Sequence, residues 1–280
     1  FDSNSNKVVV TYSDQGNSGY GTAIIGTIDD SDNSISFGSP VVFESANTDQ
    51  IAAVFDSSNN KVVIGYRDGG NSYYGTAIVG TVSGTSISFG TAATFWTTNT
   101  CEDVGASFDT NVNKVLFTFA NTIRDGYGIA GTVSGTSISF GSSHRFETGQ
   151  VRFLRAAFDN SSNTHVAIYT DHDNSQYGTS CVISVASDGT VTSATPVVWE
   201  SAETSAQDIA FDTTNNKFLI AFRQVGSSNR GTGIVGTVSG TTISFGTKND
   251  WNSVLTQSPA LAFNDASGTF VILYDESGGT

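Results

Sequence analysis

Short apolar runs alternate with turn-forming residues along the whole chain. Four such runs follow one another between residues 51 and 95, and they read IAAVFD (51–56), KVVIGYRD (61–68), YYGTAIVGTV (73–82) and SISFGTAATF (86–95). The separators SSNN, GGNS and SGT consist of residues that favour tight turns, and none of them leaves room for a helix. We name these runs strands A, B, C and D. Their order predicts an antiparallel meander of four strands, which is the form of a propeller blade.

The B strands are apolar on both faces. In the second unit, Val62, Ile64 and Tyr66 share one face, and Val63 lies on the other. A sheet with one face in water would instead alternate apolar and polar residues. We therefore expect both faces to be covered, as in a blade stacked between two neighbours. His165 takes the first of these positions in the fourth unit, and we interpret it as a local variant rather than a ligand.

The dipeptide Phe-Asp marks the period of this pattern. Its successive copies, together with the variant Phe263-Asn264, are 50 to 54 residues apart, a spacing typical of propeller blades. Residues 1–280 are thus interpreted as one all-β domain with repeats at about 1–54, 55–107, 108–157, 158–210, 211–262 and a partial repeat at 263–280. The strand order predicts a five-bladed β-propeller whose C-terminal strands, from PALAFN (259–264), close the ring onto the first blade. A six-bladed ring with incomplete blades and an open part of a longer array are the alternatives.

One phrase recurs with little change. YGTAIVGTVSGTSISFG at 74–90 has close copies at 20–38, 127–141 and 231–246. A shared C strand, a Ser-Gly-Thr turn and a Phe-Gly kink would give every blade a matching face for the next one. Small residues occur both in strand C, as Gly75 and Ala77, and in strand A, as Ala52 and Ala53. Either strand could therefore be the one that crowds around the central axis.

The two rims of such a propeller differ in character. The A–B and C–D turns share a repetitive rim, whereas the B–C and D–A loops share a rim that varies from blade to blade. Loops held on a rigid scaffold are the usual place for binding. Aromatic rings beside carboxylates and amides suit a sugar. The candidate ligand-binding residues on the variable rim are Glu44, Trp96, Arg124, Arg152, Arg155, Asp171, His172 and Glu200. The alternative for Trp96, Trp199 and Trp251 is a buried hydrophobic position after strand D.

Metal and cofactor chemistry finds little support in the sequence. Asp14, Asp68 and Asp171 each open a B–C turn, and we favour a turn-stabilising carboxylate over calcium, because D-x-D-x-D-G never appears. Cys101 and Cys181 lie at non-equivalent positions and are expected to be free thiols. No cofactor, metal site or catalytic residue is predicted. The closeness of the repeats favours a protein that is not an enzyme, because one active site needs different residues from different blades.

Charge narrows the range of partners. With 12 Lys and Arg against 26 Asp and Glu, the formal net charge of −14 disfavours nucleic acid. The absence of an 18-residue apolar run disfavours membrane insertion. Because the chain lacks Met and begins with Phe1, we expect it to be part of a longer, multi-domain protein. An acidic surface rich in hydroxyl and amide groups favours an extracellular, cell-surface or virion location.

The phrase F-D-x-x-x-N-K-V-V-x-x-Y-x-D-x-G-N-S-x-Y-G-T-A resembles tandem repeats of large surface proteins of marine bacteria and their phages, and this resemblance implies adhesion or display. The B–C turn is also similar to the Asp-box of sialidase-type propellers at Asp68, Gly70 and Ser72, without its usual Trp. The function expected from the sequence is a non-enzymatic binding module that recognises a glycan or surface partner through the variable rim. The alternatives are a structural spacer without a ligand and a glycoside hydrolase.

Overall fold

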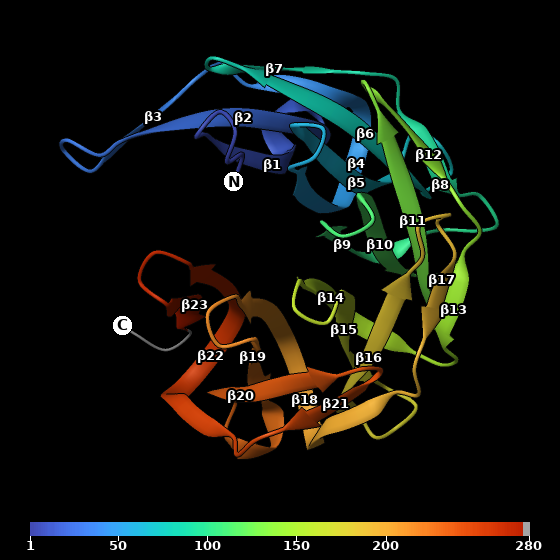
Figure 1. The fold of residues 1–280 in the computed structure, drawn as a ribbon, viewed down its shortest axis with the longest axis vertical. Coiled ribbons are helices and arrows are strands. Elements are labelled where there is room, and N and C mark those ends of the chain that lie inside the picture. Colours follow the sequence, from blue (N-terminus) through green and yellow to red (C-terminus); the bar gives the residue numbers. More distant parts are fainter. Residues whose placement is uncertain (277–280) are drawn as a thin grey trace.

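The computed structural model of the protein describes residues 1–276 as a set of antiparallel sheets arranged around an axis (Figure 1). Short 3-10 turns, η1 (Gln15–Asn17) and η2 (Val225–Ser227), are the helical elements of this range. The all-β fold predicted from the sequence is therefore confirmed. No helix within residues 1–276 is long and apolar enough to cross a lipid bilayer.

The strands group into blades that follow the sequence order. Blade 1 contains β1 (Val8–Asp14), β2 (Tyr20–Asp29), β3 (Ser34–Phe37) and the start of β4 (Val41–Asp56). Blade 2 contains the rest of β4, β5 (Lys61–Asp68), β6 (Tyr74–Ser83), β7 (Ser86–Phe89) and β8 (Ala93–Trp96). Blade 3 contains β9 (Glu102–Asp109), β10 (Lys114–Ala120), β11 (Gly126–Ser134), β12 (Ser137–Phe140) and β13 (His144–Glu147).

The remaining strands repeat this plan. Blade 4 contains β14 (Val151–Asp159), β15 (Thr164–Asp171), β16 (Tyr177–Val185), β17 (Val191–Ser193) and the start of β18 (Val197–Asp212). Blade 5 contains the rest of β18, β19 (Lys217–Gln224), β20 (Arg230–Ser239), β21 (Thr242–Phe245) and the start of β22 (Asn249–Asn264). The rest of β22 and β23 (Thr269–Glu276) form a sixth, two-stranded unit. Strands A, B and C of each complete blade pair in that order, and strand D is broken into two short segments.

Strand A lies innermost. The A segments of β4, β9, β14, β18 and β22 pack against one another around the axis, and strands B, C and D follow outward. The sequence left strand C as an equal candidate because of its glycines. The glycines of strand C are required for another reason. A Cβ at Gly75 would lie 2.4 Å from the ring of Phe95, and one at Gly178 would lie 2.5 Å from the ring of Trp199. They make room for the aromatic residue of strand D.

The recurring phrase also shapes the contact between blades. At the Phe-Gly kink of blade 1, a Cβ on Gly38 would lie 1.9 Å from the carbonyl oxygen of Thr85 in the next blade's Ser-Gly-Thr turn. The same distance separates a Cβ on Gly90 from the carbonyl oxygen of Thr136 in blade 3. The kink of one blade therefore rests directly on the turn of the following blade, which explains why both elements of the phrase recur together.

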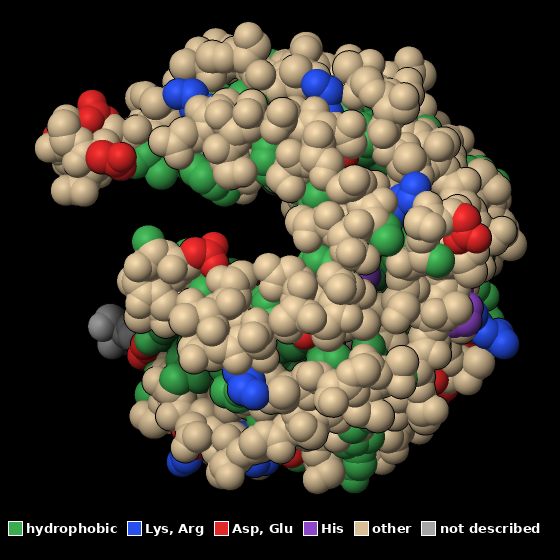
Figure 2. All heavy atoms as spheres, in the orientation of Figure 1, with side chains coloured by type: hydrophobic (Ala, Val, Ile, Leu, Met, Phe, Trp, Pro, Cys, Tyr) green, Lys and Arg blue, Asp and Glu red, His purple; other side chains and the backbone are tan. Residues whose placement is uncertain are grey.

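The predicted closure of the ring is not present in residues 1–276. Strand β22 pairs with β20 and β23, while β1 pairs with β2, and no strand pair within this range joins the two ends. Figures 1 and 2 show the resulting gap between the upper arm, which carries β1, β2 and β3, and the lower arm, which carries β23. The physical reason is that β23 occupies the edge of β22 through which that strand would have to pair with β1. Residues 1–276 thus form an open arc with four complete blades and an incomplete unit at each end.

Candidate functional site

A groove follows the axis of the arc and is lined by the A strands of consecutive blades. It has a volume of about 400 Å³ and is formed by Gln50–Ala53 of β4, Val104–Ala106 of β9, Arg155 and Ala156 of β14, and Asp208 of β18. A neighbouring hollow of about 250 Å³ shares Arg155 and Asp208 and extends along Phe153, Ala206 and Pro259 toward β22. The axial groove therefore runs past several blades, and two charged residues belong to both parts.

These two charges interrupt a series of small residues. The position three residues before the Phe of each Phe-Asp motif is occupied, in blade order, by Ala52, Gly105, Arg155, Asp208 and Ala260. The small residues keep the groove open. At the same position of strand A, blade 4 instead supplies the guanidinium of Arg155 in β14, and blade 5 supplies the carboxylate of Asp208 in β18. The groove is therefore polar at one wall and formed mostly by backbone and methyl groups at the opposite wall.

The two charged side chains differ in how they are held. Asp208 accepts hydrogen bonds from the backbone N–H of Leu261 at 2.7 Å and of Ile209 at 2.9 Å. Burial raises its pKa above the ordinary value, and these N–H donors and Arg155 act in the opposite direction. Arg155 is exposed and donates from Nη1 to the carbonyl of Leu154 at 2.8 Å. It forms no ion pair within residues 1–276, and it lines both parts of the groove.

A network of ion pairs lies at the mouth of the groove. Arg67 contacts Asp49 and Glu102, each at 2.6 Å, and Arg124 contacts Asp103 at 2.6 Å. These acidic residues belong to bulges at which every A strand begins, with positive φ at Gln50, Asp103, Phe153, Ala206 and Ser258. The contact of Arg67 with Glu102 joins blades 2 and 3, and the other two pairs lie within one blade. The network therefore fixes the mouth of the groove. Arg124, one of the predicted site residues, contributes to it through its ion pair with Asp103.

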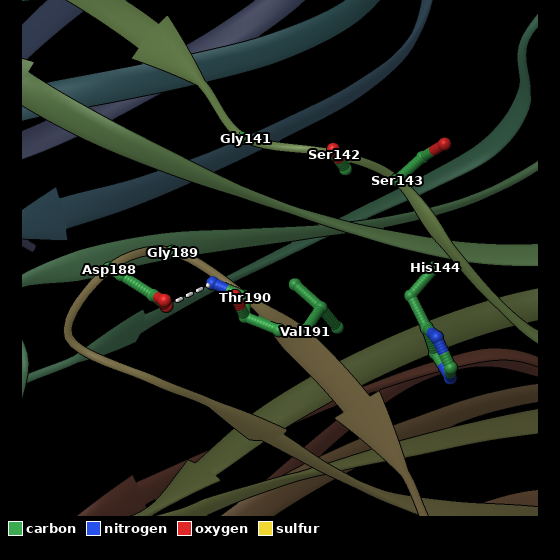
Figure 3. A pocket seen from close by; sticks show the side chains of 8 residues that line it. All are labelled: Gly141, Ser142, Ser143, His144, Asp188, Gly189, Thr190 and Val191. Carbon is green, nitrogen blue, oxygen red and sulfur yellow. Dashed lines mark hydrogen bonds between the residues drawn. The ribbon is translucent and has the colours of Figure 1, made fainter.

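A second hollow lies at the periphery between β12–β13 and the β16–β17 turn (Figure 3). It has a volume of about 300 Å³. The Oδ1 of Asp188 accepts the N–H of Thr190 at 2.9 Å, and Nε2 of His144 is 2.9 Å from Oγ of Ser193. Hydrogen bonds from Thr190 lower the pKa of Asp188, so its carboxylate serves to stabilise the turn. These polar groups already have partners, which makes this hollow a weaker candidate than the axial groove.

Three of the predicted site residues share one repeated position between blades. Glu44, Trp96 and Glu200 each follow the last aromatic residue of strand D. Glu44 accepts a hydrogen bond from the hydroxyl of Tyr66 in the next blade at 3.2 Å, and Glu200 pairs with Lys248 and accepts from Gln224 at 3.4 Å. Burial and the nearby Asp68 raise the pKa of Glu44. This position therefore joins neighbouring blades and does not face the groove.

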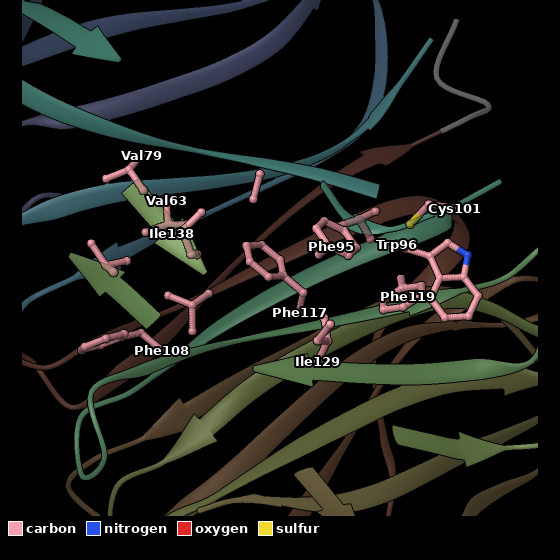
Figure 4. Close-up of a cluster of buried hydrophobic side chains, with 14 residues drawn as sticks. Val63, Val79, Phe95, Trp96, Cys101, Phe108, Phe117, Phe119, Ile129 and Ile138 are labelled. Carbon is pink, nitrogen blue, oxygen red and sulfur yellow. The ribbon is translucent and has the colours of Figure 1, made fainter. Parts of the chain in front are cut away.

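The prediction that Trp96 stacks on a sugar is wrong. Its side chain is 8% exposed and belongs to the core between blades 2 and 3 (Figure 4). The ring packs against Phe119 and Tyr127, with centroid distances of 5.1 and 4.8 Å, and Nε1 donates to Asn99 at 3.1 Å. Neither face of the indole is free for a ligand. The alternative, a buried hydrophobic position, is confirmed for Trp96 and for Trp199, which is 6% exposed.

The other predicted residues belong to blade 4. Asp171 accepts the backbone N–H groups of Asp173 and Asn174, both at 3.1 Å, which confirms its interpretation as a turn-stabilising carboxylate. Asp14 and Asp68 accept the N–H of Gly16 and Gly70 in the same way. Arg152 and His172 lie near one another at the variable rim, where burial and Arg152 lower the pKa of His172. Arg155 is thus the one predicted residue that lines the axial groove.

Asp208 is a groove residue that the sequence did not reveal. It lies inside strand A rather than in a loop, and differences between the loops of the two rims give no information about such a position. The signal was present in the alignment of repeats, where Arg155 and Asp208 break a series of Ala and Gly. It could not be used because the sequence left open which strand is innermost.

The buried thiols and His165 are structural. Cys101 and Cys181 are free, as predicted, and both are buried. Burial raises the pKa of each thiol, for Cys181 to about 12. His165 is fully buried, with Nδ1 2.7 Å from Oγ of Ser107 and Nε2 3.6 Å from Oδ2 of Asp109. The interpretation of His165 as a local variant is consistent with these contacts, because all three groups are closed off from solvent.

No protein-family model matches the sequence, and no curated protein sequence matches it. Solved structures do match the fold. AofleA from Arthrobotrys oligospora, in a variant with three arginines replaced by alanine, gives a TM-score of 0.57 at 11% identity over 97% of this chain and 80% of that one. The periplasmic gluconolactonase PpgL of Pseudomonas aeruginosa gives 0.52 at 10% identity over 97% and 96%. An exo-β-1,3-galactanase from Phanerochaete chrysosporium, solved with β-1,3-galactotriose, gives 0.50 at 12% identity over 80% of this chain and 59% of the galactanase.

These similarities show a propeller-type fold and correct one prediction. The closeness of the repeats predicts a protein that is not an enzyme, but the fold is shared with a galactanase and a gluconolactonase, so that conclusion is overturned. The prediction that the protein is not an enzyme assumes that closely similar repeats prevent the blades from contributing different residues. The axial position, with Arg155 and Asp208 on adjacent blades, shows that the blades do contribute different residues at the centre.

Proposed function

We propose that the protein recognises a carbohydrate in the axial groove, with Arg155 and Asp208 as its polar contacts. The observation that carries this proposal is the pair of opposite charges at the one level of the A strands where the other blades have Ala or Gly. A volume of about 400 Å³ lies within the range of about 300–1,000 Å³ that is usual for ligand pockets.

The chemistry of the groove suits a sugar. A guanidinium donates hydrogen bonds to hydroxyl oxygens, and a carboxylate accepts them from hydroxyl groups. The wall formed by Ala52, Ala53, Gly105 and Ala106 offers methyl and backbone surface to the C–H face of a sugar ring. The galactanase that shares the fold was solved with a galactose trisaccharide, which supports a glycan as the class of ligand. Display outside the cell or on a virion, where glycans are met, remains part of this proposal.

The test is glycan binding by variants of the groove. Immobilised glycans are first screened with the wild-type chain, and the best ligand is then titrated by calorimetry against Arg155→Ala and Asp208→Asn. We expect each variant to bind about 10-fold to 100-fold more weakly, because a hydrogen bond to a charged group contributes about 1.5–3 kcal/mol. Analysis of the same mixtures for released sugars would show whether the bound glycan is also cleaved.

Arg145→Ala provides the matched control. Arg145 is an exposed arginine at the periphery of blade 3, where it pairs with Asp125 at 3.1 Å. We expect this variant to bind like the wild type. Thermal unfolding of all variants confirms that they fold. Unchanged affinity in both Arg155→Ala and Asp208→Asn would contradict the proposal, and so would equal losses in all three variants.

A further inference from the structure

The mouth of the axial groove contains an arginine without an acceptor. Every other arginine of the chain donates to an acceptor within residues 1–276, and these are Arg67, Arg124, Arg145, Arg155, Arg223 and Arg230. The exception is Arg152, at the start of β14. Its Nε is closed off from water and has no hydrogen-bond partner in the described part of the chain. A buried donor without a partner costs free energy and is rare in folded proteins.

The other blades show which kind of partner Arg152 lacks. The residue before the bulge of strand A is, in the order of blades 2 to 5, Asp49, Glu102, Arg152 and Ser205. In blade 2, Asp49 faces Arg67 of strand B and accepts hydrogen bonds from it at 2.6 and 2.7 Å. In blade 5, Ser205 faces Arg223 and accepts a hydrogen bond from it at 2.7 Å. An arginine on strand B therefore has its acceptor on strand A.

Blade 4 reverses this arrangement. The arginine is on strand A, and the residue that faces it on strand B is Thr170. The hydroxyl of Thr170 is already hydrogen-bonded to that of Thr204 at 3.1 Å. Arg152 also forms no ion pair within residues 1–276. The protein thus places a guanidinium at the mouth of the groove and supplies no anion for it.

Backbone hydrogen bonds bring two loops of the variable rim to Arg152. The N–H of Val151 donates to the carbonyl of Arg124 at 2.9 Å, and the N–H of His172 donates to the carbonyl of Gln150 at 2.9 Å. The B–C loops of blades 3 and 4 therefore lie beside the start of β14, one on each side of it. Their basic residues, Arg124 and His172, are fixed near Arg152 by the backbone.

The charges near His172 are mixed. Burial is the main cause that lowers its pKa, and Arg152 and Arg124 act in the same direction, whereas Glu203 and Asp171 act in the opposite direction. Arg124 is paired with Asp103, and Asp171 accepts two N–H groups of its turn. Glu203 is exposed and forms no ion pair within residues 1–276. The unpaired cation is therefore Arg152.

We propose that Arg152, with His172 beside it, binds an anionic group of a sugar, a carboxylate or a sulfate, so that the glycan bound in the axial groove is an acidic one. This inference rests on the proposed function and names the class of its ligand. A guanidinium donates hydrogen bonds in a planar fork that fits two oxygens of one anionic group. The imidazole of His172 adds a further ring nitrogen as a donor.

The position of Arg152 continues the axial groove. The next residue, Phe153, lines the groove together with Arg155 and Asp208. Three residues of extended chain separate Arg152 from Arg155, which is a distance of about 10 Å. A glycan of several sugars can therefore place one ring beside Arg155 and Asp208 and an acidic ring beside Arg152.

The net charge of the molecule disfavours such a ligand at long range. With a formal charge of −14, the protein repels anions in general. Interactions between exposed charges are largely screened beyond about 8 Å at physiological salt, so a cation in direct contact still attracts an anionic group. A preference for acidic over neutral glycans therefore requires a local site and does not follow from the charge of the whole molecule.

The experiment compares glycans that share a backbone and differ in charge. Polygalacturonate is paired with its methyl ester, and a sulfated galactan is paired with its desulfated form. Biolayer interferometry measures the affinity of the wild-type chain for each immobilised glycan. We expect the acidic member of at least one pair to bind about tenfold or more tightly than its neutral counterpart. The pair that shows this preference identifies the anionic group, and a preference in neither pair would overturn the proposal.

Variants assign the preference to Arg152. We expect Arg152→Gln to weaken binding of the acidic glycan about tenfold or more and to leave binding of the neutral one unchanged. Arg152→Lys keeps the charge and should retain part of the preference. Glu203→Gln removes the exposed carboxylate near His172 and should strengthen binding of the acidic glycan about two- to fivefold. Arg145→Gln is the matched control, because it removes a positive charge from the periphery of blade 3 and should keep the full preference.

The result that would overturn the role of Arg152 is an unchanged preference in Arg152→Gln, or an equal loss of preference in Arg145→Gln. Thermal unfolding is measured for every variant. Arg152→Gln is expected to unfold at no lower a temperature than the wild type, because its guanidinium has no acceptor to lose. Arg155→Ala and Asp208→Asn are expected to weaken acidic and neutral glycans alike, whereas Arg152→Gln affects the acidic glycan alone. Failure of this inference is therefore distinguishable from failure of the proposed function.

Discussion

Single residues at the ends of strand D determine how neighbouring blades meet. The residue after the last aromatic position lies against the next blade, and at three contacts its partner is the aromatic residue of strand B. A glutamate accepts the hydroxyl where that residue is Tyr, and an indole packs against the ring where it is Phe, as seen for Glu44 with Tyr66, Glu147 with Tyr169 and Trp96 with Phe119. Blade 4 differs, because the next blade has Phe222 and Glu200 accepts from Gln224 instead. These carboxylates and this indole resemble a sugar site in sequence, yet their partners are in the protein itself.

His165 compensates for a missing amide in the neighbouring blade. In blades 2 and 5, Oδ2 of Asp56 and of Asp212 accepts the side-chain amide of Asn59 and of Asn215. Blade 3 has Val112 at this position, so the equivalent Oδ2 of Asp109 lacks the amide. His165 of blade 4 places Nε2 at 3.6 Å from this oxygen. A contact within one blade is thereby replaced by a contact between two blades.

We expect His165→Val to lower the free energy of unfolding by about 1–3 kcal/mol, because it leaves a buried carboxylate oxygen without a polar neighbour. Val is the residue that blades 1 to 3 have at this position. Adding Val112→Asn to the variant should recover part of the loss, while Val112→Asn in the wild type should not stabilise. Urea unfolding measures all four proteins. Equal stability of the wild type and His165→Val would show that the contact contributes nothing.

Because of His165, we expect the stability of the protein to depend on pH. Burial lowers the pKa of His165 below its ordinary value of about 6.5, although Asp109 acts in the opposite direction. The unfolded chain therefore takes up a proton below about pH 6.5, while the folded protein does so only at lower pH. The stability contributed by the neutral histidine is complete above that value and is lost as the pH falls. We expect the stability advantage of the wild type over His165→Val to shrink between about pH 7.5 and pH 5.5. An advantage that is constant over this range would contradict the lowered pKa.

At the scale of elements, the repeated phrase encodes a contact between blades as well as a strand within each blade. The kink glycines Gly38 and Gly90 lie against the carbonyl oxygen of the next blade's turn, where no Cβ fits. Gly246 has the same place in blade 5, but the sixth unit has no such turn within residues 1–276. Its nearest neighbour to an added Cβ is the carbonyl oxygen of Val235, at 3.8 Å. The chain thus contains two kink glycines, Gly38 and Gly90, that are confined by the turn of the next blade, and an equivalent one, Gly246, that is not.

Gly90→Ala is expected to destabilise the protein by about 1–3 kcal/mol, because its Cβ would lie 1.9 Å from the carbonyl oxygen of Thr136 and would push the two blades apart. Gly246→Ala is the matched variant at the last blade and should change stability little. Thermal and urea unfolding measure both. Equal effects of the two substitutions would mean that the glycine serves the local chain conformation and not the contact between blades.

The strands could be predicted from the sequence because alternation and turn residues are local signals. The apolar positions of KVVIGYRD and the turn SSNN are sufficient to identify strands β4 and β5. The radial order of the strands is not local. Gly75 and Ala52 are both small, but one makes room for the ring of Phe95 and the other borders the axial groove. The site depends on this order, which is why the sequence places Arg155 at the rim and does not reveal Asp208.

At the scale of the whole molecule, the arc differs from a closed ring because its first blade and its sixth unit do not pair with each other within residues 1–276. Closure is predicted by counting strands, and counting cannot show which edge of β22 is free. The structure shows that β23 takes that edge. Each blade contacts its neighbours alone, so stability is expected to add up from blade to blade, as in other repeat proteins. Within residues 1–276, blades 2 to 5 have a neighbour on both faces, and the first blade and sixth unit have one.

Hydrogen exchange measures this difference between the middle and the ends. The B strands β1, β10, β15 and β23 have equivalent positions in their units, so their backbone amides can be compared directly. We expect β10 and β15 to exchange most slowly, and β1 and β23 to exchange faster, because local opening of an end unit breaks the contact with a single neighbour. Uniform protection of all four strands in the free protein would mean that the ends of the arc are already covered in solution, and the open arc would then not be the state that the protein adopts.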